Sequence, residues 1–580
     1  MQRRLNGFLA ALRPDNLNPT PPRIATDRQG LWLGVFNPAE RSAVHDLSAY
    51  AGWLAQPQEP WWPIGAPAPE GSYALLRGSP SAAEALMDYA GSRALWVAKT
   101  EEIFIASTSQ RAIPYFLGSF EGNIEAQAWM LSSGTLGPTA GWDRRAVRLV
   151  PGGSVRLDRA RWKLSIAAPT LEFKTDSAPD AVHAGRLRHA LHETLSDLQL
   201  DRSRWVLPLS GGHDSRALLL LMKDRKQLRA ITWGSARSLK RRGNDAWVAQ
   251  RVAAKLGVSH EYFETDLSDE PLETFMRRYL TAGEGATDGL NAYLDGFRTF
   301  SSLFNRGARG VIRGDQCFGL TAGLDPTDAR QVYASVGLTR WMDFPQAPDL
   351  AALGLAELAC PPIPEPLAQR DGESMQGWRD RLYQAFRLPV YMAGQAELKA
   401  AYVETANPFL TRALIELTRA QPEHLRRGKA LFRQIVAPLD VSVDYAIENA
   451  IISPQDFLQT PRVREWLSEC LCAQSLRQRF TPQLADYLLA AVAPPVKAGL
   501  RVRAGAYWRR ARQYARMTLP EAARALVRRT PHQRTFDPRW VALRACIASG
   551  MQERLAQDAK AGSRYIRDDH GIPQIVLSRA

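Results

Sequence analysis

The 580-residue sequence has little cysteine or histidine, and neither residue is spaced as in a disulfide framework or a zinc site. The nine histidines form no HExxH pair and no cluster with cysteine, which excludes a locally assembled transition-metal site but leaves an oxygen-ligand site open. Without a disulfide pattern we expect a reducing compartment and a cytoplasmic protein. The five cysteines are Cys317, Cys360, Cys470, Cys472 and Cys546.

Long apolar runs are also missing. The longest aliphatic runs, residues 217–222 and 488–493, fall far short of the roughly 20 residues needed to cross a bilayer. No apolar segment of signal-peptide length follows the charged start of the chain. We therefore expect neither a transmembrane helix nor export.

Acidic residues are outnumbered, with 59 Asp and Glu against 74 Lys and Arg and a formal net charge of +15. Such an excess suits a nucleic acid, a membrane surface or an acidic small molecule. Much of it is local, because residues 497–544 hold thirteen basic residues and two acidic ones. Its compensating partner is either the chain's own acidic surface or an acidic partner outside the chain, such as anionic lipid. The closest basic neighbours are Arg501, Arg503, Arg509, Arg510, Arg512 and Arg516.

The length and the ordinary composition, with 45% hydrophobic and 23% charged residues, predict a folded chain of two or three domains. Short apolar runs between turns predict a strand-rich domain over residues 1–170, with no long helix in its first 60 residues. Alternating strands and helices over about 180–263 predict a helix-covered parallel sheet in a domain of residues 171–460. Residues 461–580 are expected to form a basic helical C-terminal extension.

A glycine loop, SGGHDS at residues 210–215, lies between a predicted strand at 205–209 and a predicted helix. Adjacent glycines allow close backbone approach, and the free N–H groups at a helix start favour an anion such as phosphate. Asp214 would repel phosphate directly, so its expected role is to bind Mg²⁺ that bridges phosphate oxygens. The alternative is a tight structural turn.

This loop resembles the pyrophosphate loop of the N-type ATP pyrophosphatases, and the sequence that follows is similar to the asparagine synthetase family. The later similarities are ITWG at 231–234, VIRGDQCFG at 311–319, ETANPFL at 404–410 and KALFR at 429–433, and together they cover roughly residues 180–440. The resemblance implies an α/β chain in which a glutaminase-like β-rich domain of αββα type precedes an ATP pyrophosphatase domain of the adenine nucleotide α hydrolase type.

The resemblance also implies the cofactors ATP and Mg²⁺ and a set of site residues. Asp214 and Asp315 would hold the metal, with Asp315 a turn residue on the alternative view. Lys429 and Arg433 would neutralise departing pyrophosphate or form a solvated helix face, and Glu404 would orient the acceptor amine or stabilise a buried network. The residues expected to bind ATP are Leu209, Ser210, Gly211, Gly212, Asp214, Ser215, Thr232, Trp233 and Gly314.

The N-terminal region resembles the family's glutaminase half at residues 107–110 and 150–153. A working glutaminase of this family needs Cys directly after the initiator Met, so that the free amine assists the thiolate. Gln2 stands there, and no cysteine precedes Cys317. We therefore expect no glutamine hydrolysis, and the amine must come from another source.

Two groups of the family fit that description, the β-lactam synthetases and the lasso peptide cyclases, and the short loop at 313–315 with Arg216 resembles the cyclases. A cyclase would adenylate a side-chain carboxylate of a precursor peptide and close a macrolactam with the N-terminal amine. Two departures are Gln316, where the family has glutamate, and the absence of a late Arg-x-Lys-x-Gly loop.

The alternatives are a small-molecule amide or β-lactam-type synthetase, an ammonia-dependent asparagine synthetase, a tRNA-modifying ATP pyrophosphatase and a non-catalytic scaffold. We find neither the Cys pairs nor the compact RNA-binding module common in the tRNA enzymes, so no nucleic-acid partner is expected. The expected partners are the precursor peptide, a leader peptidase and a leader-binding protein. A weak contact with a membrane surface is left open.

Overall fold

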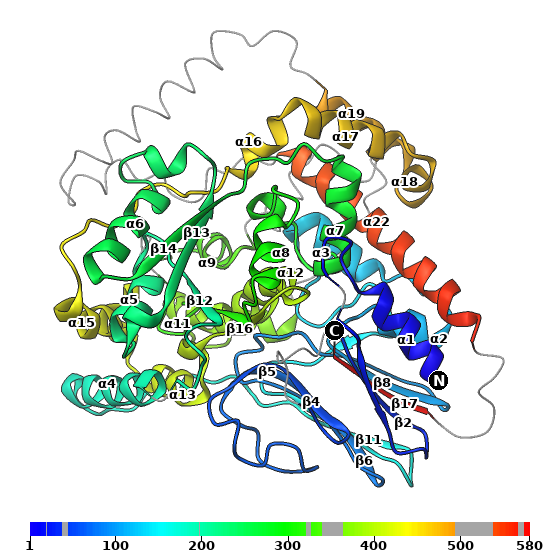
Figure 1. The fold of residues 1–580 in the computed structure, drawn as a ribbon, viewed down its shortest axis with the longest axis horizontal. Coiled ribbons are helices and arrows are strands. Elements are labelled where there is room, and N and C mark those ends of the chain that lie inside the picture. Colours follow the sequence, from blue (N-terminus) through cyan, green and yellow to red (C-terminus); the bar gives the residue numbers. More distant parts are fainter. Residues whose placement is uncertain are drawn as a thin grey trace.

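Three β-sheets organise the chain in the computed structural model (Figure 1). The structure describes residues 1–18, 20–36, 44–196, 198–320, 326–338, 364–493, 537–565 and 574–579. Two six-stranded sheets belong mainly to the first 170 residues, and a five-stranded parallel sheet lies beyond them. Most of the basic cluster predicted within 497–544 falls outside the described residues.

The first six-stranded sheet has the order β1-β2-β17-β8-β7-β9. Its third strand comes from the far end of the chain and runs parallel to both neighbours, with Leu577 opposite Leu33 and Ala106. The C-terminal portion is therefore helical but also supplies a central strand to the N-terminal sheet. The strands are β1 (Arg23–Thr26), β2 (Leu31–Val35), β17 (Gln574–Arg579), β8 (Ile103–Ser107), β7 (Trp96–Lys99) and β9 (Val147–Arg148).

The second six-stranded sheet is antiparallel throughout. One hydrophobic cluster joins it to the first sheet, with buried Leu76 and Ala85 from this sheet and Phe104 and Leu577 from the other. Its order is β11 (Lys163–Ala167), β10 (Ser154–Asp158), β6 (Ala82–Met87), β5 (Gly71–Gly78), β4 (Ser48–Leu54) and β3 (Val44–His45).

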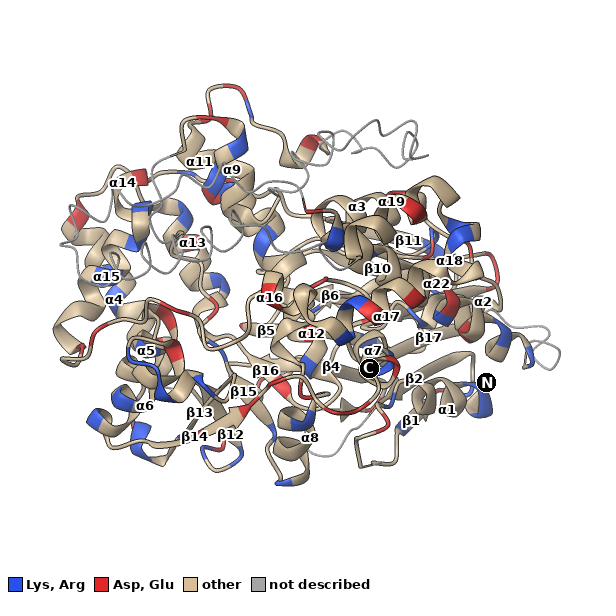
Figure 2. Cartoon of the chain, turned by 90° about the horizontal axis from the view of Figure 1, so that it is seen from above, with Lys and Arg blue, Asp and Glu red and all other residues tan. Residues whose placement is uncertain are grey.

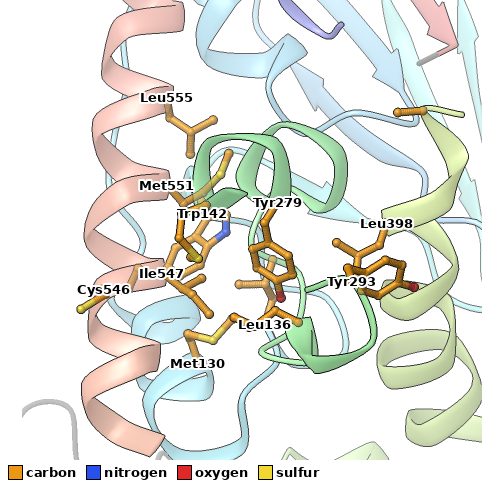
Figure 3. Packing of buried hydrophobic residues seen from close by; sticks show 14 of the residues in the cluster. Met130, Leu136, Trp142, Tyr279, Tyr293, Leu398, Cys546, Ile547, Met551 and Leu555 are labelled. Carbon is orange, nitrogen blue, oxygen red and sulfur yellow. The ribbon is translucent and has the colours of Figure 1, made fainter. Parts of the chain in front are cut away.

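Helices next to these sheets build a second core. A short helix at the N-terminus, α1, was not predicted, although it is compatible with the expectation of no long helix in the first 60 residues. Leu5, Phe8 and Leu9 bury one of its faces. Figure 3 shows α22 packed through Ile547 and Met551 toward Trp142 and Tyr279 of this core. These helices are α1 (Gln2–Ala11), α2 (Ala112–Leu117), α3 (Ile124–Ser133) and α22 (Pro538–Ser563).

The five-stranded sheet is parallel, as the alternating pattern predicts. Its order is β14 (Ser259–Glu264), β13 (Arg229–Gly234), β12 (Trp205–Pro208), β15 (Gly310–Ile312) and β16 (Glu404–Ala406). The helix α6 (Asp245–Leu256) shows why the local prediction succeeds. Asn244 caps it by accepting from the N–H of Ala246, and Gly257 ends it in the left-handed conformation with φ 65°.

The remaining helices surround this sheet or continue beyond it. Around the sheet lie α4 (Asp180–Ser196), α5 (His213–Leu221), α7 (Leu272–Gly283), α8 (Arg298–Asn305), α9 (Ala329–Val336), α11 (Met375–Leu382), a π-helical turn (Tyr383–Met392), α12 (Ala393–Ala400), α13 (Arg412–Ala420), α14 (Glu423–Arg426) and α15 (Ala430–Val436). The later ones are α16 (Pro454–Gln459), α17 (Pro461–Cys472), α18 (Gln474–Arg479) and α19 (Pro482–Val492).

The expected α/β class is confirmed at this level: a β-rich N-terminal region, a parallel sheet and a helical C-terminal portion. The domain boundaries at 170 and 460 stay predictions, as does the likeness of the first region to a glutaminase. Among the described helices, none combines the length and the apolar character needed to span a bilayer.

The charges of the described residues are interspersed, with basic and acidic segments along the same helices and loops (Figure 2). Of the thirteen basic residues counted above, Arg539 and Arg544 fall in the described part. Arg539 pairs with Asp537, and buried Arg544 pairs with Asp288. Both of these arginines therefore find their acidic partners within the chain.

Candidate functional site

The glycine loop lies between β12 and α5, as predicted, and is closed by its own serines. The N–H of Ser210 donates to Oγ of Ser215 at 2.9 Å, and the N–H of Gly212 donates to Oγ of Ser210 at 3.2 Å. Gly211 must be glycine, because a Cβ there would lie 2.5 Å from Cβ of Ala446. The loop therefore presents backbone at the start of a helix, where N–H groups favour an anion.

Asp245, which the sequence analysis did not single out, holds this loop from the neighbouring helix. The N–H of Gly211 donates to its Oδ1 at 2.6 Å. Burial raises the pKa of Asp245 to about 6, although the bond from Gly211 opposes that rise. The loop is thus fixed by a carboxylate at the first position of α6.

Asp214 and Lys429 form the central ion pair. The Lys429 ammonium donates to both carboxylate oxygens, at 2.7 and 2.6 Å. Burial favours the neutral form of Asp214, but His213 and Lys429 prevail and lower its pKa. Burial and the charge of Arg433 lower the pKa of Lys429, while Asp214 opposes them. The pair brings together two of the predicted residues, 215 positions apart.

The backbone of Lys429 is strained. Its φ is 62°, in the left-handed region, and Gly428 before it has a φ of 59°. A left-handed conformation costs a non-glycine residue about 1–3 kcal/mol, and such positions concentrate at functional sites. The lysine is also 3% exposed, so the fold holds its ammonium in place at some cost.

Gly314 and Asp315 follow β15 and lie beside the glycine loop. A Cβ at Gly314 would come within 2.9 Å of the N atom of Ser215, so these backbones are in direct contact. Arg313 pairs with Asp315 at 2.9 Å. Burial opposes the charge of Arg313, but Asp315 raises its pKa. Each carboxylate of the expected metal pair therefore has its own cation.

Tyr383 lies near both carboxylates. Burial first, and then the charges of Asp214 and Asp315, raise its pKa well above the ordinary value. Its hydroxyl donates to the carbonyl of Gln316 at 2.8 Å and accepts from the Gln316 side-chain amide at 3.0 Å. Gln316, where the resembling family has glutamate, therefore anchors a tyrosine at this site.

A pocket of about 380 Å³ opens at the carboxyl ends of β12 and β13. Four predicted residues line it, namely Leu209, Ser210, Thr232 and Trp233. Thr232 donates to the carbonyl of Leu209 at 2.5 Å, which ties the two strand ends together. The segment 449–451 closes one side, and a Cβ on Gly234 would lie 2.5 Å from the carbonyl of Ala450. Ligands of open parallel sheets bind at this end of the strands.

Glu404 is the predicted residue that the structure does not bring to the loop. It stands at the amino end of β16, opposite Gly310 at the start of β15. Its carboxylate accepts from the N–H of Gly52 at 3.0 Å and pairs with Arg579 of β17. These contacts match the buried network that was left open as its alternative role.

Arg433 is exposed on α15 and lies close enough for its charge to lower the pKa of Lys429.

The sequence analysis missed other residues that line the pocket. Arg313 was within the quoted 311–319 segment, but Tyr293 and Lys399 carried no signal, because one lies in a loop and the other in an amphipathic helix.

A metal would have to be completed by its substrate. The described part of the chain contains no group of three or more His, Cys, Asp or Glu that would hold an ion. Asp214 and Asp315 are hard oxygen donors, and Mg²⁺ typically takes one or two carboxylates with phosphate oxygens and water. The two residues fit this demand. Mg²⁺ bound there would supply counter-charge to a triphosphate.

Comparison with known proteins assigns the middle of the chain. Residues 186–288 match the family described as asparagine synthase, which is well under half of the 580 residues. The match contains the glycine loop and β13 and ends before Asp315 and Lys429. No curated protein matches the chain in sequence. Residues 186–288 are therefore an asparagine synthase-family domain, and this family consists of ATP-dependent, AMP-forming carbon–nitrogen ligases.

Proposed function

We propose that this protein adenylates a side-chain carboxylate of a precursor peptide and closes a macrolactam with the peptide's N-terminal amine. The observation that carries the proposal is the ion pair between Lys429 and Asp214, which lies in the glycine loop of the asparagine synthase-family segment 186–288. The same glycine loop, through Ser210, lines a pocket of about 380 Å³ at the carboxyl ends of parallel strands.

The first step is attack of the substrate carboxylate on the α-phosphorus of ATP, with release of pyrophosphate. The glycine loop would bind the phosphates through its N–H groups. Lys429 would stabilise the negative charge on departing pyrophosphate, a role that suits a buried ammonium with a fixed position. Asp214 and Asp315 would hold Mg²⁺ against the same phosphates.

The second step is attack of an amine on the acyl adenylate. Residue 2 is Gln, and it begins helix α1 rather than presenting a nucleophile. The N-terminal region therefore gives no support to an internal supply of ammonia. A tethered amine suits this arrangement, because holding both ends of one peptide together contributes up to about 7–11 kcal/mol when the geometry is good.

The partners follow from this chemistry and are proposals too. The precursor peptide is the substrate, and a leader peptidase and a leader-binding protein would prepare it. We propose a cytoplasmic site of action, where ATP is abundant. We propose that the basic residues at 501–516, which lie outside the described residues, bind peptide, protease or anionic lipid, with the chain's own acidic surface as the alternative.

The test uses the full chain with Mg²⁺, ATP and a panel of synthetic peptides, each with a free N-terminal amine and one internal Asp or Glu. We expect loss of one water from a peptide, with stoichiometric AMP and pyrophosphate. The control peptide has an acetylated N-terminus and should exchange pyrophosphate without cyclising. Glutamine and ammonia form further arms.

Two results would redirect the assignment. Amide formation only with ammonia or a free small amine would favour the small-molecule or asparagine-forming alternatives. Pyrophosphate exchange that depends on added tRNA rather than peptide would revive the nucleic-acid reading. Inactivity toward every acceptor would contradict the proposal.

A further inference from the structure

The inner end of the pocket holds a buried lysine that the proposed chemistry has not used. Lys399, on α12, lines the pocket together with Tyr293, Arg313 and Gln395 and is only 2% exposed. Its ammonium nitrogen donates to Oη of Tyr293 at 2.8 Å and to the carbonyl of Gln395 at 2.6 Å. Figure 3 shows Tyr293 beside Leu398, the residue before this lysine.

Among the residues that the structure describes, no carboxylate is hydrogen-bonded to Lys399, in contrast to Lys429. Its two partners are a phenol and a carbonyl, both neutral. The centroids of the Tyr293 and Phe300 rings lie 5.4 and 5.9 Å from the nitrogen, and their faces would offset only part of the cost of burying a charge there. A charged ammonium is costly in such surroundings unless an acid is paired with it.

The charged groups around Lys399 also favour its neutral form. Burial and the nearby Arg313 lower its pKa well below the ordinary value, and the more distant Asp315 and Glu397 only partly oppose them. Arg313 itself pairs with Asp315 at 2.9 Å, so that carboxylate is already the partner of another cation. Burial raises the pKa of Tyr293, so this phenol beside Lys399 carries no charge at neutral pH.

A neutral lysine has two N–H bonds and one lone pair. Here the two N–H bonds have acceptors, the hydroxyl of Tyr293 and the carbonyl of Gln395. The lone pair is then left to accept a proton, and Lys399 is one of the residues that line the pocket. This is the geometry of a proton acceptor rather than of an anion-binding group, which needs free N–H bonds.

We propose that Lys399 is a catalytic base that takes the proton from the acceptor amine as it attacks the acyl adenylate. The inference rests on the proposed function. In this step the N–C bond forms, the C–O bond to AMP breaks, AMP leaves with the electron pair, and the proton passes to Nζ of Lys399. Tyr293 is a positioning residue, because it acts through Lys399.

The first test needs no substrate. Trace acetylation with acetic anhydride across pH, read by mass spectrometry, reports the neutral fraction of each lysine relative to its own plateau. At pH 7, Lys399 should reach at least about tenfold more of its plateau than exposed Lys226. Equal titration of the two lysines would overturn the proposal.

The second test separates the two half-reactions in Lys399→Met, with Lys399→Gln as a second variant and Lys226→Met as the matched control. With a peptide that the wild type accepts, pyrophosphate exchange should stay within a few-fold, while cyclisation falls by about 10²–10⁴. Hydroxylamine, which is largely unprotonated at pH 7, should restore acyl transfer. Tyr293→Phe should shift the pH profile of cyclisation.

The outcomes distinguish the two claims. If none of the peptides supports pyrophosphate exchange by the wild-type protein, the proposed function fails before the variants are compared. If the wild type is active but Lys399→Met loses exchange, the lysine binds the carboxylate or ATP and is not the base. Unchanged cyclisation in a folded Lys399→Met also overturns the inference.

Discussion

A carboxylate is held by polar partners both at the parallel-sheet site and at the boundary with the N-terminal region, but the surroundings of the two carboxylates differ. Asp214, with 31% of its side chain exposed, pairs with Lys429, and its loop lines a pocket of about 380 Å³ through Ser210. Glu284, at the boundary with the N-terminal region, is enclosed by Ser109 and Gln110 next to a cavity of about 50 Å³. A catalytic site needs charged groups next to a space large enough for a ligand. Of these two places, the parallel-sheet site has both, whereas the cavity beside Glu284 is too small.

The largest effect is expected from the two aspartates of the parallel-sheet site. Asp214→Asn and Asp315→Asn should each abolish peptide-dependent pyrophosphate exchange, because each removes an oxygen donor and a counter-charge. Exchange kinetics at saturating Mg²⁺, with circular dichroism to verify folding, make the measurement. Near-normal exchange by a folded variant would show that the substituted aspartate is not needed for adenylation.

Lys429→Met should lower kcat for adenylation by about 10²–10³, the usual loss when one fixed donor to a transition state is removed. Asp214 is partly exposed and remains solvated, so the fold should survive the change. Lys226→Met, at an exposed position, is the matched control. A loss confined to the melting temperature would instead make the Asp214–Lys429 pair structural.

Leu577→Ala tests the N-terminal region. The side chain is fully buried in β17, between β2 and β8, so its truncation should reduce the free energy of unfolding by about 2–5 kcal/mol. Affinity for ATP, measured by calorimetry well below the melting temperature, should not change. Leu439→Ala, at a residue 47% exposed, serves as the control. Weakened ATP binding would show that the two regions are coupled.

Glu284 gives the smallest effect, a pH dependence of stability. Burial raises its pKa to about 7 from 4.5, so the folded protein binds more protons than the unfolded chain between these values. Its stabilising contribution is present below pH 4.5 and is lost as the pH rises through about 7. Glu284→Gln should therefore flatten the fall in melting temperature from pH 5 to 8 by a few degrees. Exposed Glu101→Gln should leave that fall unchanged.

Much of the parallel-sheet region could be predicted because its signals are local. The helix at Asp245–Leu256 has its cap, its apolar face and its terminal glycine within one short segment. The glycine loop is recognisable from its own sequence and from the strand and helix that flank it. The family resemblance predicts Asp214 and Lys429 as site residues but not the ion pair between them, since nothing local links positions 215 residues apart.

The rest depends on tertiary contacts that no short pattern encodes. Residues 574–579 read as a short apolar run, but their partners in β2 and β8 lie hundreds of positions earlier. Lys399 reads as the polar face of a helix, and only packing against Tyr293 buries it. Glu404 was assigned to the site by its motif, whereas the register of β16 puts it at the opposite end of the strand.

The most direct test of the central claim is the transfer of oxygen from the peptide to AMP. A peptide that the protein accepts is prepared with ¹⁸O in its Asp or Glu side-chain carboxylate, and the AMP released on cyclisation is analysed by mass spectrometry. Adenylation predicts one ¹⁸O in AMP, because the C–O bond of the acyl adenylate breaks on the carbonyl side. Unlabelled AMP, or formation of ADP with labelled phosphate, would contradict the account.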